Sequence, residues 1–386
     1  MKKIAIVSCV ADWGGSEELW ARSIPYLQQD GYQIALLKSN INKSQPEFLA
    51  LAKIGVELIE LDPGSPTLYK LLKKAKSAFH KVAATLKIKK HQHQELKTFR
   101  KAIKKQRPAL VIIGQGINFD GLKLANECLS LKIPYVIISQ KAVDFYWPSP
   151  NDRAMMLNVL QQAKHCFFVS HHNKRLTEEQ FGQRLSNSSV VFNPVKLAGA
   201  PIPYPSAEGT YKLACVGRLF VLDKGQDILL RILAQEEWRS RPIQVSFIGK
   251  GPDEAGLKDM VNLLNITNVT FAGQIEDIGK IWESHHALLL PSRSEGLPLS
   301  MVEAMSVGRP VIITHAGGNT ELVEEGVTGF IGEANERSFA NAMERAWQHR
   351  EQWKTIGENA SKFVKANVPD HPEQVFADLI LEILTE

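Results

Sequence analysis

The sequence has little cysteine and lacks a long uncharged apolar run. The four cysteines are far apart, and none lies in a C-x-x-C pair, which argues against a disulfide framework or a zinc site and favours a reducing cytoplasm. No apolar run approaches the ~20 residues that a membrane-spanning helix needs. The apolar run Ile4–Ala11 follows two lysines but is short, and no A-x-A-like cleavage site follows it, so we expect no signal peptide.

The composition is otherwise that of an ordinary globular protein. Hydrophobic residues make up 44% of the 386 residues and charged residues 23%, which excludes disordered and fibrous classes. At roughly 100–200 residues per domain, the length predicts two domains.

Near-continuous runs of Val, Ile and Leu alternate with helix-length segments along the whole chain. Such runs are typical of parallel strands that are covered on both faces, and the alternation implies βαβ units. We therefore predict an α/β fold with two Rossmann-like, doubly wound domains. The expected strands are Lys3–Val10, Gln33–Ser39, Val56–Leu61, Ala109–Gly114, Tyr135–Ser139, Cys166–Ser170, Val190–Asn193, Lys212–Val216, Gln244–Gly249, Val269–Gly273, Ala287–Pro291 and Pro310–Thr314.

One segment breaks this alternation. Leu197–Gly209 holds three prolines and two glycines, so it cannot form a regular helix or strand. We predict a first domain over 1–197, a linker over 198–210 and a second domain over 211–368. A last helix within 369–386 follows a second break, and packing back on the first domain is one option for it.

The segment 70–107 is strongly basic. It carries 14 Lys or Arg residues and one acidic residue, Glu95, so the rest of the chain carries a net negative charge. Lys-rich helices attract anionic lipid head groups or polyanions. A solvated helical hairpin and a peripheral site on an anionic membrane surface, at its inner face, both remain open. We expect no nucleic-acid partner, because no nucleic-acid-binding motif accompanies the charge.

Two glycines, Gly14 and Gly15, follow the first expected strand. Glycines at a strand-to-helix turn let the backbone approach a ligand, and the following helix N-terminus attracts an anion. A tight turn that merely needs positive φ explains them equally well.

A second motif, V-G-R followed by D-K-G, lies at the end of the first strand of the second domain. Ligands of open α/β sheets bind at that edge. The motif begins with Gly217 and Arg218, and Lys224 follows six residues after the arginine. The two charged side chains could converge on a diphosphate. The alternative is that both are exposed surface charges.

The strongest signal is the E-G-L-P-L-S-M-V-E motif, which runs from Glu295 to Glu303. Pro298 suits the first turn of a helix, so Glu295 precedes that helix and Glu303 lies within it. A carboxylate on so apolar a helix is costly when buried without a partner, and a ribose diol is a suitable one. Pairing of Glu303 with a neighbouring cation such as Arg309 is the structural alternative.

The order of these motifs resembles that of the family-four retaining glycosyltransferases, part of the glycosyl transferases group 1. G-G-x-E, V-G-R with D-K-G, and E-x7-E are followed by Gly317-Gly318 with Glu321 and by Gly326–Phe330. The resemblance covers nearly the whole chain, and the E-x7-E element is its specific part. It implies two Rossmann-like domains that face each other across a cleft, the GT-B fold. A nucleotide-diphosphate sugar would lie mainly on the second domain and the acceptor on the first.

The resemblance also implies roles for individual residues. Arg218 and Lys224 would bind the diphosphate and stabilise the leaving group. Glu295 would contact the donor sugar. These three residues are the catalytic candidates. Glu303 would hold the ribose hydroxyls, and the glycine loop would close over the sugar and phosphate. The donor-binding candidates are Gly14, Gly15, Gly217, Gly273, Gln274, Ile275, Gly296, Leu297, Pro298, Leu299 and Glu303.

The sequence departs from the family pattern on the acceptor side. Many relatives carry a His after the strand that corresponds to Tyr135–Ser139, where this chain has Gln140 and Lys141, which become our acceptor-side candidates. Many relatives also have N-G-V-D before the linker, where this chain has Asn193-Pro194-Val195.

The resemblance implies transfer with retention, without a metal or other cofactor. Arg, Lys and a helix N-terminus supply the positive charge that a divalent ion otherwise brings to the departing phosphate. We expect a sugar to be moved to a cell-envelope glycan or a lipid-linked acceptor. The alternatives are a non-catalytic nucleotide-sugar-binding module and another two-Rossmann enzyme, such as an epimerase or a phosphorylase.

Overall fold

The computed structural model describes residues 2–10, 13–61, 94–197, 202–206 and 209–385. The chain forms two compact α/β units. Unit 1 comprises residues 1–169, 173–193 and 371–386, and unit 2 comprises residues 170–172 and 194–370. Within the described part of the chain, no helix is long and apolar enough to cross a bilayer.

Unit 1 is built on a parallel sheet with the order β3-β2-β1-β4-β5-β6-β7. Its strands are β1 Lys3–Ser8, β2 Gln33–Lys38, β3 Glu57–Glu60, β4 Leu110–Gln115, β5 Tyr135–Ser139, β6 His165–Phe168 and β7 Ser188–Val190. Its helices are α1 Gly15–Gln29, α2 Pro46–Lys53, α5 Leu122–Ser130, α6 Arg153–Gln162, α7 His171–Phe181 and α16 Pro372–Thr385, and residues 94–106 are also helical.

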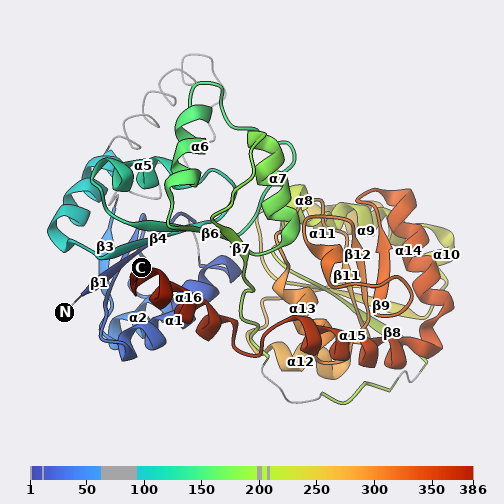
Figure 1. Cartoon of the computed structure of the whole chain (residues 1–386). Helices are drawn as coiled ribbons and strands as arrows, with labels where there is room; N and C mark the ends of the chain where they lie inside the picture. The colour runs from blue at the N-terminus through green and yellow to red at the C-terminus, as the bar shows by residue number, and fades with distance from the viewer. Residues whose placement is uncertain (1, 11–12, 62–93, 198–201, 207–208, 386) are drawn as a thin grey trace. The chain divides into compact units, whose positions relative to one another are not determined.

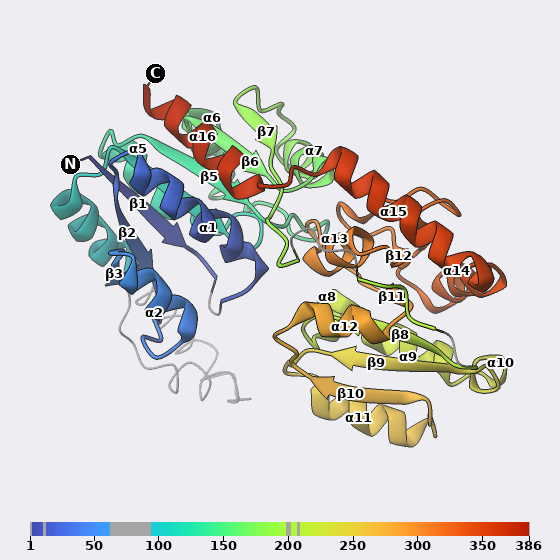
Figure 2. The ribbon, with the colours of Figure 1, turned by 90° about the horizontal axis from the view of Figure 1, so that it is seen from below.

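Both faces of this sheet are buried, which is why its strands are apolar throughout. In β1, Ile4 and Ile6 face one core, shared with α1, α2 and α16, whereas Ala5 and Val7 face a second core, shared with α5 and α6 (Figure 1). The C-terminal helix α16 lies beside α1 (Figure 2) and buries Phe376 and Ile380 in the first of these cores. The last helix therefore returns to unit 1.

Unit 2 has a parallel sheet with the order β10-β9-β8-β11-β12-β13. Its strands are β8 Tyr211–Val216, β9 Ile243–Ile248, β10 Val269–Gly273, β11 Ala287–Leu290, β12 Val311–Thr314 and β13 Gly329–Gly332. Its helices are α8 Val221–Lys224, α9 Gln226–Leu233, α10 Glu236–Arg239, α11 Glu254–Leu263, α12 Ile278–Ser284, α13 Leu299–Ser306, α14 Glu336–Gln348 and α15 Trp353–Asn367, with 3-10 turns at Asn319–Glu321 and Arg350–Gln352.

The predicted linker differs in the structure. The change of unit falls between Asn193 and Pro194, and the described linker residues 202–206 pack on unit 2. The buried guanidinium of Arg309 donates to the carbonyl oxygens of Ile202 and Pro203, at 3.4 and 2.7 Å, and Tyr204 donates its hydroxyl to the carbonyl oxygen of His286 at 3.2 Å. The described residues 202–206 form neither helix nor strand, and the sequence did not reveal that a buried arginine would bind two of their carbonyl groups.

In both sheets the chain reverses its direction of travel across the sheet at one point. The order is the 3-2-1-4 order of a doubly wound sheet, with the switch between β1 and β4 in unit 1 and between β8 and β11 in unit 2. At such a switch point the connections on the two sides of the sheet diverge, and open α/β sheets generally bind their ligands there, at the carboxyl ends of the strands.

At the switch point of unit 2, the segment that follows β8 touches the segment that follows β11, and the contact is made at Gly225. This residue has φ of +61° between α8 and α9, and a Cβ atom there would lie 2.0 Å from the carbonyl oxygen of Pro291, just after β11. Position 225 therefore requires glycine for two reasons: the backbone has a positive φ, and there is no room for a Cβ atom.

In unit 1 a buried ion pair lies near the corresponding place. Lys38, at the end of β2, and Glu17, in α1, are both almost fully buried, and the Lys38 Nζ lies 3.6 Å from the Glu17 Oε1. Lys38 also donates to Ser8 Oγ at 2.8 Å and to the carbonyl oxygen of Val10, and Ser8 donates to Glu17 at 2.8 Å. Burial raises the pKa of Glu17, although Lys38 and the hydrogen bonds from Ser16 and Ser8 oppose the shift.

Replacement of Gly225 should therefore destabilise the fold. We expect Gly225→Ala to lower the free energy of unfolding by about 2 kcal/mol or more, because of the left-handed backbone and the contact with Pro291. Gly256, on the exposed side of α11 with nothing near its missing Cβ, provides the matched control. Gly256→Ala should raise stability by about 1 kcal/mol, through helix propensity. Urea unfolding of both variants checks this, and equal changes would contradict it.

Replacement of Lys38 should be costly, because it would leave the Glu17 carboxylate buried without its cation. We expect Lys38→Met to cost about 3–5 kcal/mol in urea unfolding, and Lys38→Met with Glu17→Gln to recover part of that loss. The control is Lys123→Met, which removes an exposed partner of Asp152 at 3.8 Å and should cost at most about 1 kcal/mol. A Lys38→Met protein as stable as the control would refute the buried pair.

Candidate functional site

The predicted motif residues of unit 2 come from loops at the carboxyl edge of its sheet. Gly217 and Arg218 directly follow β8, Lys224 ends the short helix α8, and Glu295 lies in the loop between β11 and α13. These connections leave the sheet on the two sides of its switch point, where doubly wound sheets bind ligands.

Lys224 and Glu295 join these two connections. The Lys224 Nζ lies 2.7 Å from the Glu295 Oε1 and 2.8 Å from the Oε2, and Ser292 donates its hydroxyl to the Oε1 at 2.7 Å. The Glu295 side chain is 6% exposed, whereas that of Lys224 is 24% exposed. The carboxylate is therefore held from two sides, and about a quarter of the lysine side chain stays exposed to solvent.

The backbone around this pair is tied together independently. The carbonyl oxygen of Asp223 accepts from the N–H groups of Arg293 and Ser294, at 2.7 and 3.1 Å. Arg293 in turn forms a two-pronged ion pair with Asp227, at 2.6 and 2.9 Å. Burial opposes ionisation of Asp227, but its hydrogen bonds to Arg293 and Arg231 outweigh burial and lower the pKa of this carboxyl. The loop that carries Glu295 is therefore fixed against the segment that carries Lys224.

A glycine pair supports the same loop from the side of β12. A Cβ atom at Gly317, which has φ of +57°, would lie 2.1 Å from the carbonyl oxygen of Glu295. The next residue, Gly318, donates its N–H to the carbonyl oxygen of Gly296 at 2.7 Å. The G-G-x-x-E motif therefore has a steric reason here, because only glycine lets this corner approach the Glu295 backbone.

Arg218 and Gly217 lie next to this pair in the chain but make few contacts. Arg218 is exposed, and its guanidinium carbon lies 5.5 Å from the centre of the Phe220 ring. Gly217 has φ of +156°, and a Cβ atom there would lie 3.7 Å from the Lys224 Cε. The structure thus places Gly217 against Lys224 and leaves the Arg218 side chain at the surface.

Glu303 lies in the middle of α13 and is 4% exposed. Its Oε1 accepts from the backbone N–H of Lys196 at 3.3 Å. Arg309, the cation that we named as its structural alternative, uses its guanidinium on carbonyl oxygens, including those of Trp282 and Val307. Burial lowers the pKa of Arg309 to about 10. Helix α13 begins after Pro298, so Gly296 to Leu299 form its N-terminal approach, where the first N–H groups lack helical partners.

The third predicted donor-binding segment lies at the edge of the sheet. Gly273 ends β10 with φ of +69°, at a bulge opposite β9, and its carbonyl oxygen accepts from the N–H of Gly249 at 2.7 Å. Gln274 and Ile275 follow in the loop before α12, and Gln274 is exposed. This segment shares the carboxyl edge with Lys224 and Glu295, two strands away from β8.

In unit 1, the conformation of Gly14 does not fit a tight turn with positive φ, which was the alternative explanation for this glycine. Its φ is −158°, an extended conformation that any residue adopts, and nothing lies within 4 Å of its missing Cβ. Its N–H donates to Glu17 Oε2 at 3.2 Å, so the buried Glu17 positions the loop, and Gly15 begins α1. Neither backbone strain nor crowding within the described residues accounts for glycine at position 14.

The acceptor-side candidates differ in burial. Gln140 is buried and exchanges two hydrogen bonds with Asn193, from Nε2 to Oδ1 at 3.1 Å and from Nδ2 to Oε1 at 2.7 Å. Its amide is thus engaged within unit 1. Lys141, the next residue, is partly exposed. Most of the basic segment 70–107 lies outside the described residues.

The sequence did not reveal several partners of the site, among them Ser292, the Arg293–Asp227 pair and the Glu17–Lys38 pair. Ser292 is a small polar residue directly after an apolar strand and three residues before Glu295, which is the only signal that it offered. Among the described residues, no group of three or more His, Cys, Asp or Glu side chains is placed to hold a metal ion.

Comparison with known proteins shows which family and which proteins this chain resembles. Residues 210–349, most of unit 2, match the family described as Glycosyl transferases group 1. An uncharacterized glycosyltransferase of Haemophilus influenzae is 25% identical over 343 residues, which are 87% of this chain and 87% of that protein. The O-antigen chain mannosyltransferase C of Escherichia coli is 27% identical over 162 residues, which are 40% of this chain and 43% of that protein.

Solved structures show the same fold. HepE of Anabaena, crystallised in complex with UDP, matches with a TM-score of 0.71 and 18% identity, over 99% of this chain and 100% of that chain. The sucrose-phosphate synthase of Thermosynechococcus elongatus matches with a TM-score of 0.72 and 17% identity, over 100% and 99%. The two doubly wound units and these matches show the GT-B fold, and residues 210–349, which carry the motif-bearing edge of unit 2, match the glycosyl transferases group 1 family, so the protein is a glycosyltransferase.

Proposed function

We propose that the protein is a retaining glycosyltransferase that moves a sugar from a nucleotide-diphosphate sugar to a hydroxyl of a cell-envelope glycan or a lipid-linked acceptor. The observation that carries this proposal is the Lys224–Glu295 pair at the switch point of unit 2. The named relatives support the class of acceptor, since one of them is an O-antigen chain mannosyltransferase.

In this proposal Lys224 meets the diphosphate of the donor. Its ammonium group has three N–H donors, two of which point to the Glu295 carboxylate, so one is left for a phosphate oxygen. Arg218 brings a second, exposed guanidinium to the same edge, and the first N–H groups of α13 add a partial positive charge. Together they stabilise the charge that grows on the diphosphate as the bond to the sugar breaks.

The other candidate residues have subsidiary roles. Glu295, held by Ser292 and Lys224, contacts the donor sugar, and Glu303 accepts from the ribose hydroxyls. The loop at Gly14, where neither φ nor space demands glycine, approaches the sugar and phosphate with its bare backbone.

The proposed chemistry needs no carboxylate nucleophile and no bound metal or cofactor. The acceptor hydroxyl attacks the anomeric carbon on the face from which the diphosphate leaves, so that the new C–O bond forms as the bond to the phosphate oxygen breaks. The departing phosphate oxygen takes the proton of the hydroxyl. The glycosidase scheme, in which a carboxylate forms a covalent intermediate, therefore does not transfer to Glu295 and Glu303.

A thermal-shift panel of UDP-, GDP-, ADP- and TDP-sugars tests the donor. A ligand at about 100 times its dissociation constant stabilises a fold by about 2.7 kcal/mol, which is readily measured. Slow release of free sugar from the donor that binds, without acceptor, separates an enzyme from a binding module. No shift with any member of the panel would refute the proposal, and binding without hydrolysis would favour the non-catalytic module.

Lys224→Ala should weaken binding of that donor by more than about tenfold, because truncation of a partly buried charged contact typically costs about 2–5 kcal/mol. The matched control is Lys258→Ala, which removes another lysine of unit 2 whose Nζ lies 2.7 Å from Glu254 on the surface of α11. We expect the control to bind the donor like the wild type in calorimetry. If both variants bound the donor with equal affinity, Lys224 would not be part of the donor site.

Glu303 should be responsible for recognition of the ribose. We expect the wild type to bind the nucleoside diphosphate about tenfold or more tightly than its 2′-deoxy analogue, because a hydrogen bond to a charged group contributes about 1.5–3 kcal/mol. In Glu303→Ala this ratio should fall to about one. Glu303→Gln keeps an acceptor oxygen and should show an intermediate ratio. Because the ratio compares two ligands on the same variant, a general loss of stability does not mimic the effect, and an unchanged ratio contradicts the assignment.

A further inference from the structure

Three consecutive aromatic side chains of unit 1 are exposed. Phe145, Tyr146 and Trp147 lie between β5 and α6 and are 63, 50 and 64% exposed. Most large hydrophobic side chains of this unit are buried in its two cores. We call residues 142–147 the aromatic loop. The Phe145 and Tyr146 rings lie side by side, with their centres 5.5 Å apart, and exposed apolar patches mark interaction sites.

The aromatic loop is held in place by buried amide side chains. Gln180, which is fully buried on α7, donates to the carbonyl oxygens of Val143 and Tyr146, at 2.8 and 2.6 Å. Asn118 accepts from the N–H of Val143 at 3.2 Å and donates to Gln180 at 3.0 Å. Buried amides that are satisfied in this way specify one backbone conformation. The exposure of the three rings therefore follows from how the loop is built.

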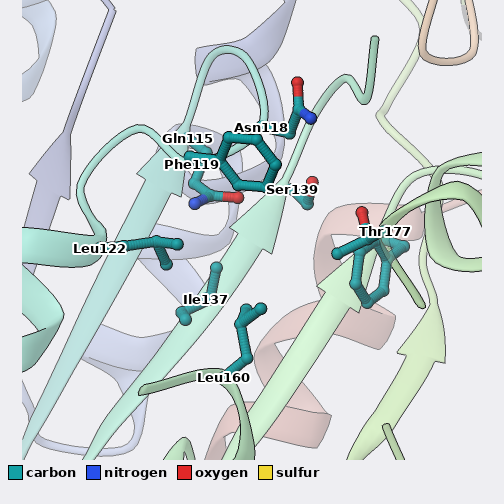
Figure 3. A pocket seen from close by; sticks show the side chains of 9 residues that line it. Gln115, Asn118, Phe119, Leu122, Ile137, Ser139, Leu160 and Thr177 are labelled. Atoms are coloured by element: carbon teal, nitrogen blue, oxygen red, sulfur yellow. The ribbon is translucent and has the colours of Figure 1, made fainter. Parts of the chain in front are cut away.

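The loop lies at the edge of the sheet where ligands bind. Two residues separate it from the end of β5, and Asn118 belongs to the loop that follows β4. Figure 3 shows Asn118 beyond the carboxyl end of β4 and Ser139 at the end of β5, over a small cavity. The cavity is lined by Gln115, Asn118, Phe119, Leu122, Ile137, Ser139, Leu160, Phe168 and Thr177. Carboxyl ends of parallel strands form the ligand edge of an open α/β sheet, so the aromatic loop stands at that edge of unit 1.

The charges of the loop favour a sugar over a membrane. Asp144 is exposed next to Phe145, and its carboxylate has no hydrogen-bond or ion-pair partner within the described ranges. Residues 141–153 carry two basic and two acidic residues, so they offer no net attraction to anionic lipid. A carboxylate that accepts from two hydroxyls beside flat apolar rings suits a saccharide, which has hydroxyl edges and a C–H face.

We propose that the aromatic loop is a saccharide-binding platform, on which a sugar ring of the acceptor stacks against Trp147 or Tyr146 while Asp144 accepts from its hydroxyls. That the sugar belongs to the acceptor rests on the proposed function. The binding of a saccharide by these rings does not, because the argument uses only residues of unit 1. Tyr and Trp are suited to this contact, because they offer large rigid surfaces at little cost in side-chain entropy.

Saturation-transfer NMR tests the platform. The probes are the methyl α-glycosides of glucose, galactose, mannose and N-acetylglucosamine, each mixed with the full-length protein. We expect at least one of them to receive saturation from the wild type, and its dissociation constant to rise by about tenfold in Trp147→Ala. Trp147→Phe keeps a ring and should restore part of the affinity. Asp144→Asn should weaken the same probe.

The matched control is Ile54→Ala. Ile54 is 43% exposed and lies between α2 and β3, at the opposite, amino edge of the same sheet. Its replacement removes exposed apolar surface of unit 1 without touching the aromatic loop, so the probe should bind this variant like the wild type. Equal losses in Ile54→Ala and Trp147→Ala would overturn the platform.

Two further measurements distinguish a failure of the proposed function from a failure of the saccharide platform. The thermal shift with the donor should be the same in Trp147→Ala and in the wild type, so a missing shift in both refutes the proposed function and leaves the platform standing. Flotation with vesicles of phosphatidylcholine and phosphatidylglycerol should not depend on Trp147. Loss of flotation in Trp147→Ala with unchanged probe binding, or no saturation of any probe by the wild type, would overturn the platform.

Discussion

The Lys224–Glu295 ion pair connects the two chain segments that diverge at the switch point of unit 2, and the geometry of the motif residues depends on it. A largely buried charge pair of this kind contributes little net stability, because the loss of hydration offsets the attraction between the charges. Its supports are correspondingly extensive: Ser292, the Asp223 carbonyl, the Arg293–Asp227 pair and the close approach of Gly317. These contacts hold the loop that carries Glu295 against the segment that carries Lys224, so they set the position of the pair.

Unit 1 offers an instructive contrast. Its sheet has the same order around the switch point, and it also carries a lysine and a glutamate there, Lys38 and Glu17. Both are almost completely buried, and Lys38 is surrounded by Ser8, the Val10 carbonyl oxygen and Glu17. Lys224 instead keeps part of its surface open. The two pairs therefore have the same residue types and differ in solvent access, since the pair of unit 1 is closed whereas Lys224 stays partly exposed.

Much of the fold could be predicted because its signals are local. The continuous apolar runs indicated parallel strands buried on both faces, and Tyr135–Ser139 and Val269–Gly273 form β5 and β10 with those bounds. The predicted strand Val190–Asn193 is observed at Ser188–Val190, because it pairs with β6 in a register that hydrophobicity does not specify. The change of unit falls between Asn193 and Pro194, a few residues before the predicted linker. The binding of the Ile202 and Pro203 carbonyl groups by Arg309 depends on a residue about a hundred positions away, which no local signal contains.

The sequence by itself determined the βαβ alternation, the position of the glycine corners and the two glutamates that flank the start of α13, since each follows from residues within one strand or one turn. Only the tertiary structure decided which charges meet. It paired Glu295 with Lys224, gave Glu303 the Lys196 N–H, engaged Gln140 with Asn193 and left Phe145, Tyr146 and Trp147 exposed on an anchored loop. The physical reason is that hydrogen bonds and burial depend on distances in space between segments that lie far apart along the chain.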